Sequence, residues 1–390
     1  MALLQTAVHQ VRHGFYGWRI VGLMLGPRAA GVGVYVFGNT LFVIPLEQDL
    51  GISRTVSSLL FALGALTSGL AAPISGVFMD RFGPRIVLIA SVLLSVAGYA
   101  LFAIADNVLL VFIVFLGPIS LTILNVAFNA SSGLANNWFE RQKATAFSVL
   151  QIGAGAGSFL ILPLLAFSIE QWGWRAAALV AGAIVLALGL PAAWLAKDTP
   201  EEMGLLPDGA PPQGASTGAG AAASAPMTGM SATEALRTPS FWLLSAGVML
   251  FGGGTIGVQV HFVPIMVWKG TTEVQAGLML TVVALSSIPL VLLAGWAADR
   301  FDRLAVGAGL CLIVAVGILL MNLAPVGPAL WVAALLFAGS MGIWPIAWAV
   351  VGQMFGRRAY STIRGYLMAV QNGRANSRDV RHTGYQRPAL

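Results

Sequence analysis

Long apolar runs separated by short charged clusters form the dominant pattern of this chain. A run of about 20 apolar residues is needed to cross the hydrocarbon layer of a bilayer. The sequence predicts ten such spans, at residues 20–46, 56–78, 85–105, 108–136, 145–169, 174–196, 241–267, 275–297, 304–323 and 328–354. We therefore expect an all-α protein that crosses the lipid bilayer many times.

A loop motif that occurs twice divides the spans into two halves. The first copy, after span two, holds Gly76, Asp80, Arg81, Gly83 and Arg85. The second copy, after span eight, holds Gly295, Asp299, Arg300 and Arg303. The offset that maps Gly76 onto Gly295 also aligns Gly33 with Gly252 and Pro45 with Pro264. A shared register of this length predicts two homologous helical halves, which is a common plan of secondary transporters.

Composition divides the chain into four parts. We assign residues 1–196 to a six-helix N-terminal half and residues 240–372 to an incomplete C-terminal half, with a polar tail at 373–390. Residues 197–239 form a linker whose central part is almost wholly Gly, Ala, Ser and Pro. That composition is typical of a flexible connection.

The charge distribution indicates how the chain is oriented. Charged residues make up only 9% of the chain, against about 25% in soluble proteins. Most basic residues lie in alternate loops, and the other side of the membrane receives only Arg54, Arg175 and Lys269. This bias places the N-terminus, the linker and the C-terminus on the cytoplasmic side of the cell (inner or plasma) membrane. The net charge is +6, but the basic residues form no stripe interleaved with aromatic residues. We therefore expect no nucleic-acid partner.

Several kinds of chemistry lack a motif in this sequence. Cys311, the single cysteine, lies within an apolar run, so the sequence offers no disulfide and no thiolate metal site. There is no phosphate-binding Gly-Lys-Ser/Thr loop, which argues against an ATP-driven pump. We expect no enzyme activity, no cofactor and no metal, and we expect a monomer.

The duplicated loop resembles the signature loop of the major facilitator superfamily. Two six-helix halves joined by a long cytoplasmic linker fit that family as well. Other segments are similar to its monocarboxylate porter and oxalate–formate antiporter branch, namely Tyr16–Trp18, Gly51–Arg54, Trp172–Arg175 and Pro200–Leu205. The resemblance implies the major facilitator fold and a secondary transporter that works by alternating access.

The resemblance also implies twelve spans, two more than the ten predicted here. A further internal match, of the segment at Trp138 to the segment at Met354, predicts that helix eleven begins near Tyr360. The polar segment from Gly373 onward leaves no room for a further span. We therefore favour a shifted reading frame or a truncated gene over a genuine ten-span protein.

The loop motif has a physical explanation. Asp80 ends the second span near the membrane surface, where a carboxylate favours the N-terminal end of another helix. Gly76 permits close helix approach, and Gly83 supplies the turn before Pro84. By resemblance, Asp80 meets the start of helix eleven and Asp299 the start of helix five, so that the loops latch the halves together. The second copy has Asp302 in place of Gly83, which predicts a looser turn. The alternative is that these charges only set topology.

Arg28 is the strongest candidate for a substrate-binding residue. The resemblance implies a cavity lined by helices one, four, seven and ten, and Arg28 lies in the first. A cation within a span costs several kcal/mol and commonly faces a cavity or a partner. Its guanidinium suits a carboxylate, which it holds through two parallel hydrogen bonds. The alternative is that Arg28 extends to the membrane surface along its aliphatic stem.

Polar residues of helices four, seven and ten complete the candidate site. Asn125 and Asn129 share a helix face with Ser132 and Asn136. We assign the first two to the cavity and the last two to interhelical hydrogen bonds. The remaining candidates are Gln259, His261, Trp344 and Trp348. His261 either carries a proton or packs between helices, and the tryptophans form either an aromatic wall of the cavity or ordinary packing.

The absence of buried acids favours an anionic substrate. Every Asp and Glu lies at the end of a span or in a loop. A buried arginine without a buried acid favours a small organic anion, such as a monocarboxylate, moved with a proton or exchanged for another anion. Efflux of a hydrophobic drug or metabolite is the rival within the transporter class. A non-transporting remnant or a membrane receptor is the rival outside it.

Overall fold

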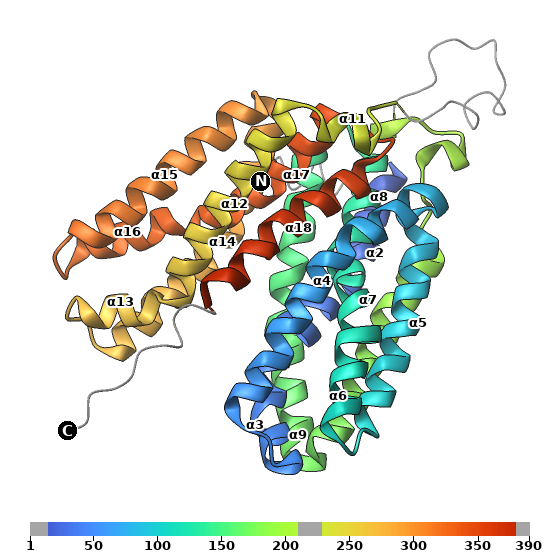
Figure 1. The fold of residues 1–390 in the computed structure, drawn as a ribbon. Helices are drawn as coiled ribbons and strands as arrows, with labels where there is room; N and C mark the ends of the chain where they lie inside the picture. The colour runs from blue at the N-terminus through green and yellow to red at the C-terminus, as the bar shows by residue number, and fades with distance from the viewer. Residues whose placement is uncertain (1–14, 210–227, 380–390) are drawn as a thin grey trace, which may run out of the picture.

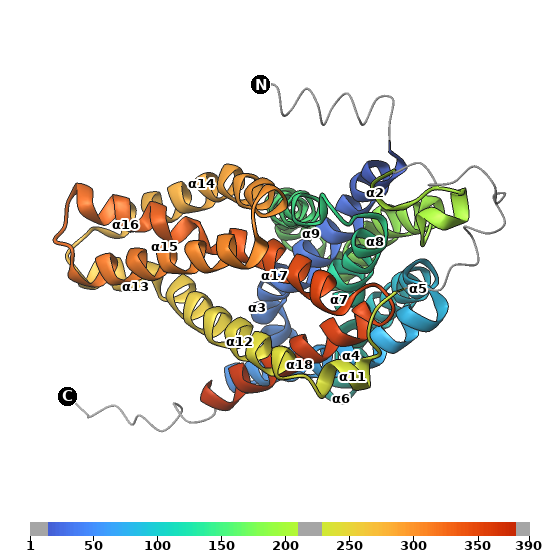
Figure 2. The ribbon, with the colours of Figure 1, turned by 90° about the horizontal axis from the view of Figure 1, so that it is seen from above.

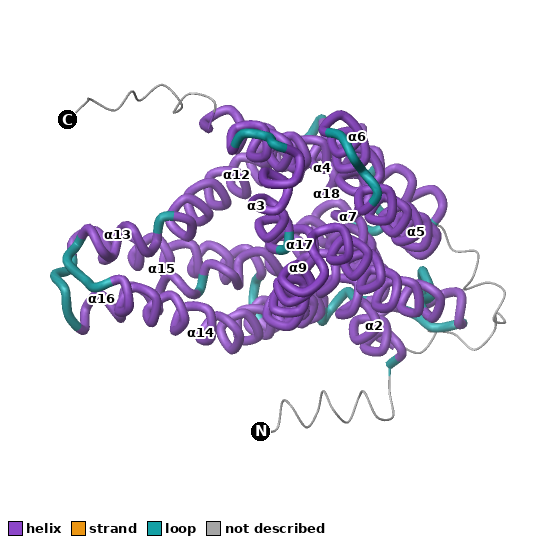
Figure 3. The backbone as a smooth tube through the Cα atoms, turned by 90° about the horizontal axis from the view of Figure 1, so that it is seen from below, coloured by secondary structure: helices purple, strands orange, loops and turns teal. Residues whose placement is uncertain are grey.

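The computed structural model describes residues 15–209 and 228–379, and within these ranges every regular element is a helix (Figure 3). Nine of the described helices are long and apolar enough to cross a membrane. One of them, α9 (Lys143–Leu195), has 53 residues and contains predicted spans five and six. Gly173, at φ 80° and ψ 170°, breaks its helical geometry between the two spans. All ten predicted spans are therefore helical.

The N-terminal half contains two spans with irregular helical segments. Span one consists of α2 (Tyr16–Gly31), the π-helical η1 (Val32–Phe37) and α3 (Asn39–Leu50). Spans two and three are α4 (Arg54–Phe82) and α5 (Pro84–Ala103). Span four consists of α6 (Val108–Val114), η2 (Phe115–Ile119), α7 (Ser120–Leu124), η3 (Asn125–Asn129) and α8 (Ala130–Trp138). Its π-helical segments accompany non-helical dihedrals at Gly117, directly before Pro118.

The C-terminal half follows the linker, residues 197–239, which contains three short helices in its described parts. These are η4 (Pro200–Met203), η5 (Pro207–Gly209) and α11 (Ala232–Leu236). The spans are then α12 (Pro239–Val260) with α13 (Phe262–Trp268), α14 (Glu273–Arg300), α15 (Arg303–Leu323), and α16 (Pro328–Ala338) with α17 (Ser340–Phe355). The last helix is α18 (Tyr360–Asp379).

Helix eleven begins where the sequence predicted, because α18 starts at Tyr360. The helix continues to Asp379, so the segment predicted as a polar tail from residue 373 is partly helical. Polarity does not end a helix by itself, and residues 373–379 contain no proline to break it. The rest of the predicted tail, residues 380–390, lies outside the described residues. So does the centre of the predicted flexible linker, residues 210–227.

Local sequence signals explain several of the helix starts. Pro84, Pro239 and Pro328 occupy first helical positions, where the missing N–H costs nothing. Thr272 opens α14 with a capping box, in which its hydroxyl accepts from the Gln275 N–H and the Gln275 side chain accepts from the Thr272 N–H. These signals mark boundaries that hydropathy alone leaves open.

The two halves meet at one end of the bundle and diverge toward the other (Figure 1). We call the meeting end the latch end; α4, α8, α14 and α17 finish there, and α11 lies beside it. Seen from above, α17 and α18 lie on the side of the C-terminal half that faces the N-terminal half (Figure 2). The main contacts across the halves join α4 to α18 and α14 to α9.

Burial differs between the halves. Of the most apolar stretch of α5, 44% is buried inside the protein, but only 17% of the corresponding stretch of α15. One hydrophobic core fills the N-terminal half and continues into α17 and α18. A smaller core lies among α13, α14, α15, α16 and α17. The outer face of the C-terminal half is therefore the less covered one.

Candidate substrate site and latch

The first latch joins α4 to the N-terminus of α18. The Asp80 carboxylate accepts hydrogen bonds from the Ser361 N–H at 3.1 Å, the Thr362 N–H at 2.9 Å and the Thr362 hydroxyl at 2.6 Å. A carboxylate at a helix N-terminus satisfies free N–H groups and complements the helix dipole. This is the contact that the family resemblance implied.

The glycines of the latch permit close helix approach. A Cβ on Gly76 would collide with the Ser361 carbonyl oxygen, and one on Gly365 would collide with the Ala72 carbonyl oxygen. Gly83 has φ 88°, and a Cβ there would meet the Asp198 carboxylate. Each position therefore requires glycine, the first two for contact between the halves and the third for its turn.

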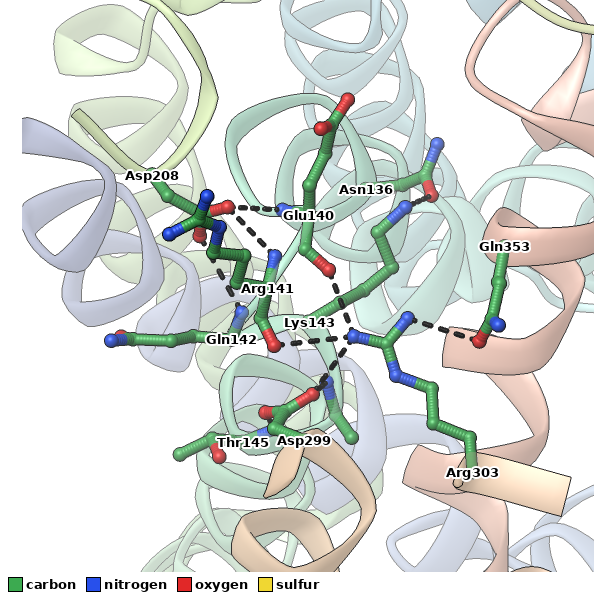
Figure 4. A network of polar contacts seen from close by, with 11 residues as sticks. Asn136, Glu140, Arg141, Gln142, Lys143, Thr145, Asp208, Asp299, Arg303 and Gln353 are labelled. Atoms are coloured by element: carbon green, nitrogen blue, oxygen red, sulfur yellow. Dashed lines mark hydrogen bonds and ion pairs between the residues drawn. The ribbon is translucent and has the colours of Figure 1, made fainter. Parts of the chain in front are cut away.

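The second latch joins α14 to the N-terminus of α9 (Figure 4). The Asp299 carboxylate accepts from the Ala144 N–H at 2.9 Å and the Thr145 N–H at 2.7 Å. Arg303 extends this contact, because its Nη2 donates to Asp299 at 3.0 Å and to the Glu140 carbonyl oxygen at 2.8 Å. The two copies of the motif thus bind equivalent helix starts in opposite halves.

The turn of the second copy differs from that of the first. Asp302 has an extended conformation at φ −64° and ψ 122°, and its side chain caps α15 by accepting from the Ala305 N–H at 2.8 Å. The turn expected to be looser is therefore fixed by a cap.

The other arginines of the motif lie beside the latch. Arg81 stacks over Phe82 and Arg300 over Trp296, with guanidinium-to-ring distances of 5.2 and 5.7 Å. Arg85 binds the C-terminal end of α9, donating to the carbonyl oxygens of Ala193 at 3.2 Å and Trp194 at 3.1 Å. It therefore ties α5 to α9 within the N-terminal half.

Acidic residues of the linker add contacts that sequence reasoning missed. Asp208 accepts from the Glu140 N–H at 3.0 Å and the Arg141 N–H at 2.7 Å (Figure 4). Glu201 forms a bidentate ion pair with Arg357 at 2.7 and 3.1 Å. The only signal in the sequence was the group of acidic residues that precedes the Gly/Ala/Ser/Pro stretch of the linker. These residues fasten the linker to the latch end.

Asp198 occupies the same region, outside the spans. Its carboxylate accepts from the Arg85 N–H at 2.7 Å and lies over the start of α5. Burial raises the pKa of the Asp198 carboxyl to about 6, although the Arg85 hydrogen bond acts in the opposite direction.

Arg28 lies inside the protein rather than at the membrane surface. The residue is 2% exposed, which excludes the alternative that it extends to the surface. Its Nη1 donates to the Ser131 hydroxyl and its Nη2 to the Gln151 side-chain oxygen, both at 3.1 Å. The guanidinium lies 4.9 Å from the Phe128 ring centre. Every one of these partners is uncharged.

A second buried arginine, Arg364 of α18, was missed in the sequence. It is 2% exposed and donates from Nη1 to the Asn129 side-chain oxygen at 2.5 Å. Its guanidinium lies 4.4 Å from the Trp348 ring centre. The signal was available, since Arg364 lies about one helical turn after Tyr360 in the expected helix eleven. It does not stand out in the sequence, because the segment around it is of mixed polarity.

Span four brings the two arginines together. Arg364 binds Asn129 and Arg28 binds Ser131, which lies slightly further along the same span. Three donor atoms of the pair are buried without a hydrogen-bond partner among the described residues: Nε of Arg28, and Nε and Nη2 of Arg364. Buried polar groups are nearly always paired, and unpaired donors in a cationic cluster are able to bind a further acceptor.

The predicted asparagines divide into two environments. Asn129 donates to the Asn125 side-chain oxygen at 2.8 Å, which orients its own oxygen toward Arg364. Asn136 accepts from the Lys143 ammonium at 2.8 Å, an interhelical contact of the kind expected (Figure 4). The Ser132 hydroxyl is buried and has no hydrogen-bond partner among the described residues.

The remaining candidates lie apart from one another. Trp344 and Trp348 stack with ring centres 6.2 Å apart, and only Trp348 covers Arg364. Gln259 and His261 lie at the break between α12 and α13, which is away from the latch end (Figure 1), and His261 is exposed there. The structure thus groups Arg28, Asn125, Asn129 and Trp348, and separates Gln259 and His261 from them.

The fold and the repeated latch define a membrane transport protein of two pseudo-symmetric helical halves. The chain matches the sequence model of the Major Facilitator Superfamily over residues 23–375 and belongs to that family. The predicted family and fold are therefore confirmed.

Known relatives support the predicted branch. The chain is 26% identical to human monocarboxylate transporter 11 over 290 residues, covering 74% of this chain and 57% of the relative. It is 24% identical to the oxalate:formate antiporter of Oxalobacter formigenes over 225 residues, covering 58% of this chain and 50% of the relative. The chain thus spans between half and three fifths of these relatives. Both are transporters rather than enzymes, in agreement with the predicted class.

A solved structure supports the fold. The transporter FucP in the outward conformation superposes with a TM-score of 0.67 at 15% identity, covering 92% of this chain and 90% of FucP.

Proposed function

We propose that this chain is a secondary transporter of a small organic anion that works by alternating access. The observation that carries this proposal is the pair of buried arginines, Arg28 and Arg364, with unpaired donor atoms. The names of the monocarboxylate and oxalate:formate relatives agree with a carboxylate as substrate.

The chemistry of the pair favours an anion. Burying one cation in a span costs several kcal/mol, and a second cation beside it adds repulsion. Among the described residues, no carboxylate is paired with either guanidinium. The unpaired Nε and Nη2 atoms of Arg364 form one edge of its guanidinium, which matches the two oxygens of a carboxylate. A bound carboxylate would satisfy both the charge and the donors.

The position of the pair fits alternating access. Arg28 belongs to the N-terminal half and Arg364 to the C-terminal half, so a shared anion would couple the movement of one half to the other. We place the latch end on the cytoplasmic side of the inner or plasma membrane, because the positive-inside rule favours that orientation. The latched conformation is then the outward-facing one.

In this proposal, any proton that is transported with the substrate is carried by the substrate itself. The arginine cluster contains no acidic residue among its hydrogen-bond partners in the described part of the chain. A carboxylate substrate can carry the proton itself or leave in exchange for another anion. His261, which is exposed at the break between α12 and α13, stays a candidate for proton transfer.

Uptake into proteoliposomes tests the proposal. Radiolabelled lactate, formate and oxalate serve as probes, with wild type, Arg28→Gln, Arg364→Gln and the control Arg54→Gln. Arg54 is exposed and pairs with Glu47 at the protein surface, so its variant should keep uptake. Loss of a charge-assisted hydrogen bond of about 1.5–3 kcal/mol should lower carboxylate uptake by about tenfold or more in the other two variants. Equal carboxylate uptake by all four proteins, or saturable transport of hydrophobic compounds alone, would overturn the proposal.

A further inference from the structure

A row of polar side chains follows one face of span four, from the arginine pair to the latch end. Asn129, Ser132 and Asn136 are spaced by three and four residues, which places them on one side of the helix. At the helical rise per residue, the row is about 10 Å long. Its first member binds Arg364, and its last member binds the Lys143 ammonium at 2.8 Å (Figure 4). A cation therefore lies at each end of the row.

The latch end of the row is buried without a complete set of partners. Ser132 and Asn136 are fully buried, and Lys143 is only 3% exposed. The Ser132 hydroxyl and the Asn136 side-chain nitrogen have no hydrogen-bond partner among the described residues. The Lys143 ammonium has three N–H donors, and the Asn136 oxygen is its one hydrogen-bond partner in the described part of the chain. These three side chains therefore hold donors that are able to bind a further acceptor.

The carboxylates near Lys143 are bound elsewhere. Asp299 accepts from the N–H groups at the start of α9 and from Arg303. Asp208 accepts from N–H groups of the loop before α9, and the Glu140 side chain is exposed. Among the described residues, no ion pair includes Lys143. A buried charge without a direct counter-charge is costly, so a small anion bound here would lower the free energy of the cluster.

The row lies along the contact between the two halves. A Cβ on Gly352 of α17 would collide with the Asn136 side-chain oxygen and come within 2.9 Å of the Lys143 ammonium. Beside the row on α8, a Cβ on Gly133 would come within 3.3 Å of the Ser361 hydroxyl of α18. Both α17 and α18 belong to the C-terminal half. Release of the latches would therefore uncover this face of span four.

We propose that Lys143, Asn136 and Ser132 form a second binding site for the substrate carboxylate, on the latch side of the arginine pair. This inference rests on the proposed function. The Lys143 ammonium supplies the charge, and the Asn136 amide and Ser132 hydroxyl supply further hydrogen bonds. The C-terminal half covers the site while the latches are closed. When they open, the anion passes between Arg364 and Lys143 along span four.

Transport kinetics measured from each face of the membrane test this site. Exchange of radiolabelled oxalate and formate is followed in inside-out and right-side-out membrane vesicles that contain the full chain, with vesicles that lack it as background. Lys143→Gln removes the charge but keeps a donor for Asn136. Asn136→Asp keeps the contact with Lys143 but neutralises the ammonium with a fixed carboxylate. Lys197→Gln is the control, because Lys197 is exposed and lies at the same end, where its carbonyl oxygen binds Trp138.

We expect both site variants to raise the half-saturating oxalate concentration on the latch face by about tenfold or more. The value on the opposite face should stay unchanged. The effect on formate should be smaller, because Coulomb attraction increases with the charge of the ligand and oxalate carries two charges. Lys197→Gln should behave as wild type does. Asn136→Asp decides the test alone if Lys143→Gln does not fold.

Four results would overturn the second site while leaving the proposed function intact. The first is a latch-face value that neither variant changes. The second is a change in Lys143→Gln that Asn136→Asp does not share, which would show that the contact is only structural. The third is an equal change for oxalate and formate, and the fourth is a rise on both faces; these would show an altered conformation or an altered arginine site. Absence of carboxylate exchange in wild type would instead overturn the proposed function, and the second site with it.

Discussion

At the scale of single residues, the contact between the halves depends on positions where no side chain fits. Gly76 faces the Ser361 backbone, and Gly365 faces the backbone of Ala72 and Pro73. Backbone atoms cannot move aside as a flexible side chain can, so even a methyl group must separate the helices. The same close approach brings α18 near enough for Asp80 to bind its first N–H groups.

Gly76→Ala should therefore destabilise the protein. Overpacking of a tight interface costs about 1–3 kcal/mol, because the added Cβ collides with the Ser361 carbonyl oxygen. Gly22→Ala on α2 is the matched control, since a Cβ there has nothing within 4 Å and alanine favours a helix. Thermal unfolding in detergent should show a lower midpoint for Gly76→Ala only. Equal midpoints for both variants would contradict the close contact.

At the scale of elements, the segment after α9 carries a titratable contact. Burial raises the pKa of Asp198 to about 6, above its ordinary value near 4. A carboxyl with a raised pKa in the folded state binds its proton more tightly there than in the unfolded state. Its contribution to stability is therefore fully present at acidic pH and is lost as pH rises through about 6.

We expect Asp198→Asn to flatten this dependence. In wild type, Asp198 should make the thermal unfolding midpoint decrease as the pH rises from about 4 to about 6.5. The asparagine can still accept a hydrogen bond from the Arg85 N–H but does not titrate, so this decrease of the unfolding midpoint with pH should disappear. Asp106→Asn, at an exposed position, is the control. Parallel pH profiles for wild type and Asp198→Asn would show that burial does not raise this pKa.

The elements also show how far the sequence could predict the structure. Apolar runs located all ten spans, and the internal repeat, with the family resemblance, predicted which loop meets which helix start. The π-helical segments of span four were not predictable, because their register depends on packing around Gly117 and Pro118. Hydropathy separated spans five and six, but the structure joins them through a single turn at Gly173.

The candidate site was only partly predictable. Arg28 stood out as a cation in an apolar run, and the asparagines as polar residues on one helix face. Gln151 and Ser131 are ordinary polar residues in the sequence, and only helix packing brings them to Arg28. Arg364 lies in a segment of mixed polarity, where one more charge carries little information. Contacts between the halves depend on tertiary packing, which local spacing does not encode.

At the scale of the whole molecule, both latches hold the same end of the bundle closed. Each carboxylate binds two backbone N–H groups of a helix start in the opposite half. Under the alternating access that we propose, opening this end would require both contacts to break. The latches would then set the balance between the two conformations.

Asp80→Asn should shift that balance toward the open form. Replacing the carboxylate with an amide should weaken the latch by about 1–2 kcal/mol, or about 5- to 30-fold in population. A cysteine replacing Ser361, whose hydroxyl faces Gly133 of α8, reports the opening in a Cys311→Ser background. Its labelling by an impermeant maleimide from the latch side should increase with Asp80→Asn but not with Asp49→Asn at the opposite end. Unchanged labelling in both would contradict the latch.

The central claim is that an organic anion binds between Arg28 and Arg364. Calorimetric titration of the purified chain with oxalate, formate and lactate tests it directly, without a transport cycle. We predict saturable binding of at least one carboxylate, with affinity about tenfold or more weaker in Arg28→Gln and in Arg364→Gln. Arg54→Gln should bind as wild type does. Absence of carboxylate binding, or affinities unchanged by either substitution, would contradict the assignment of the site.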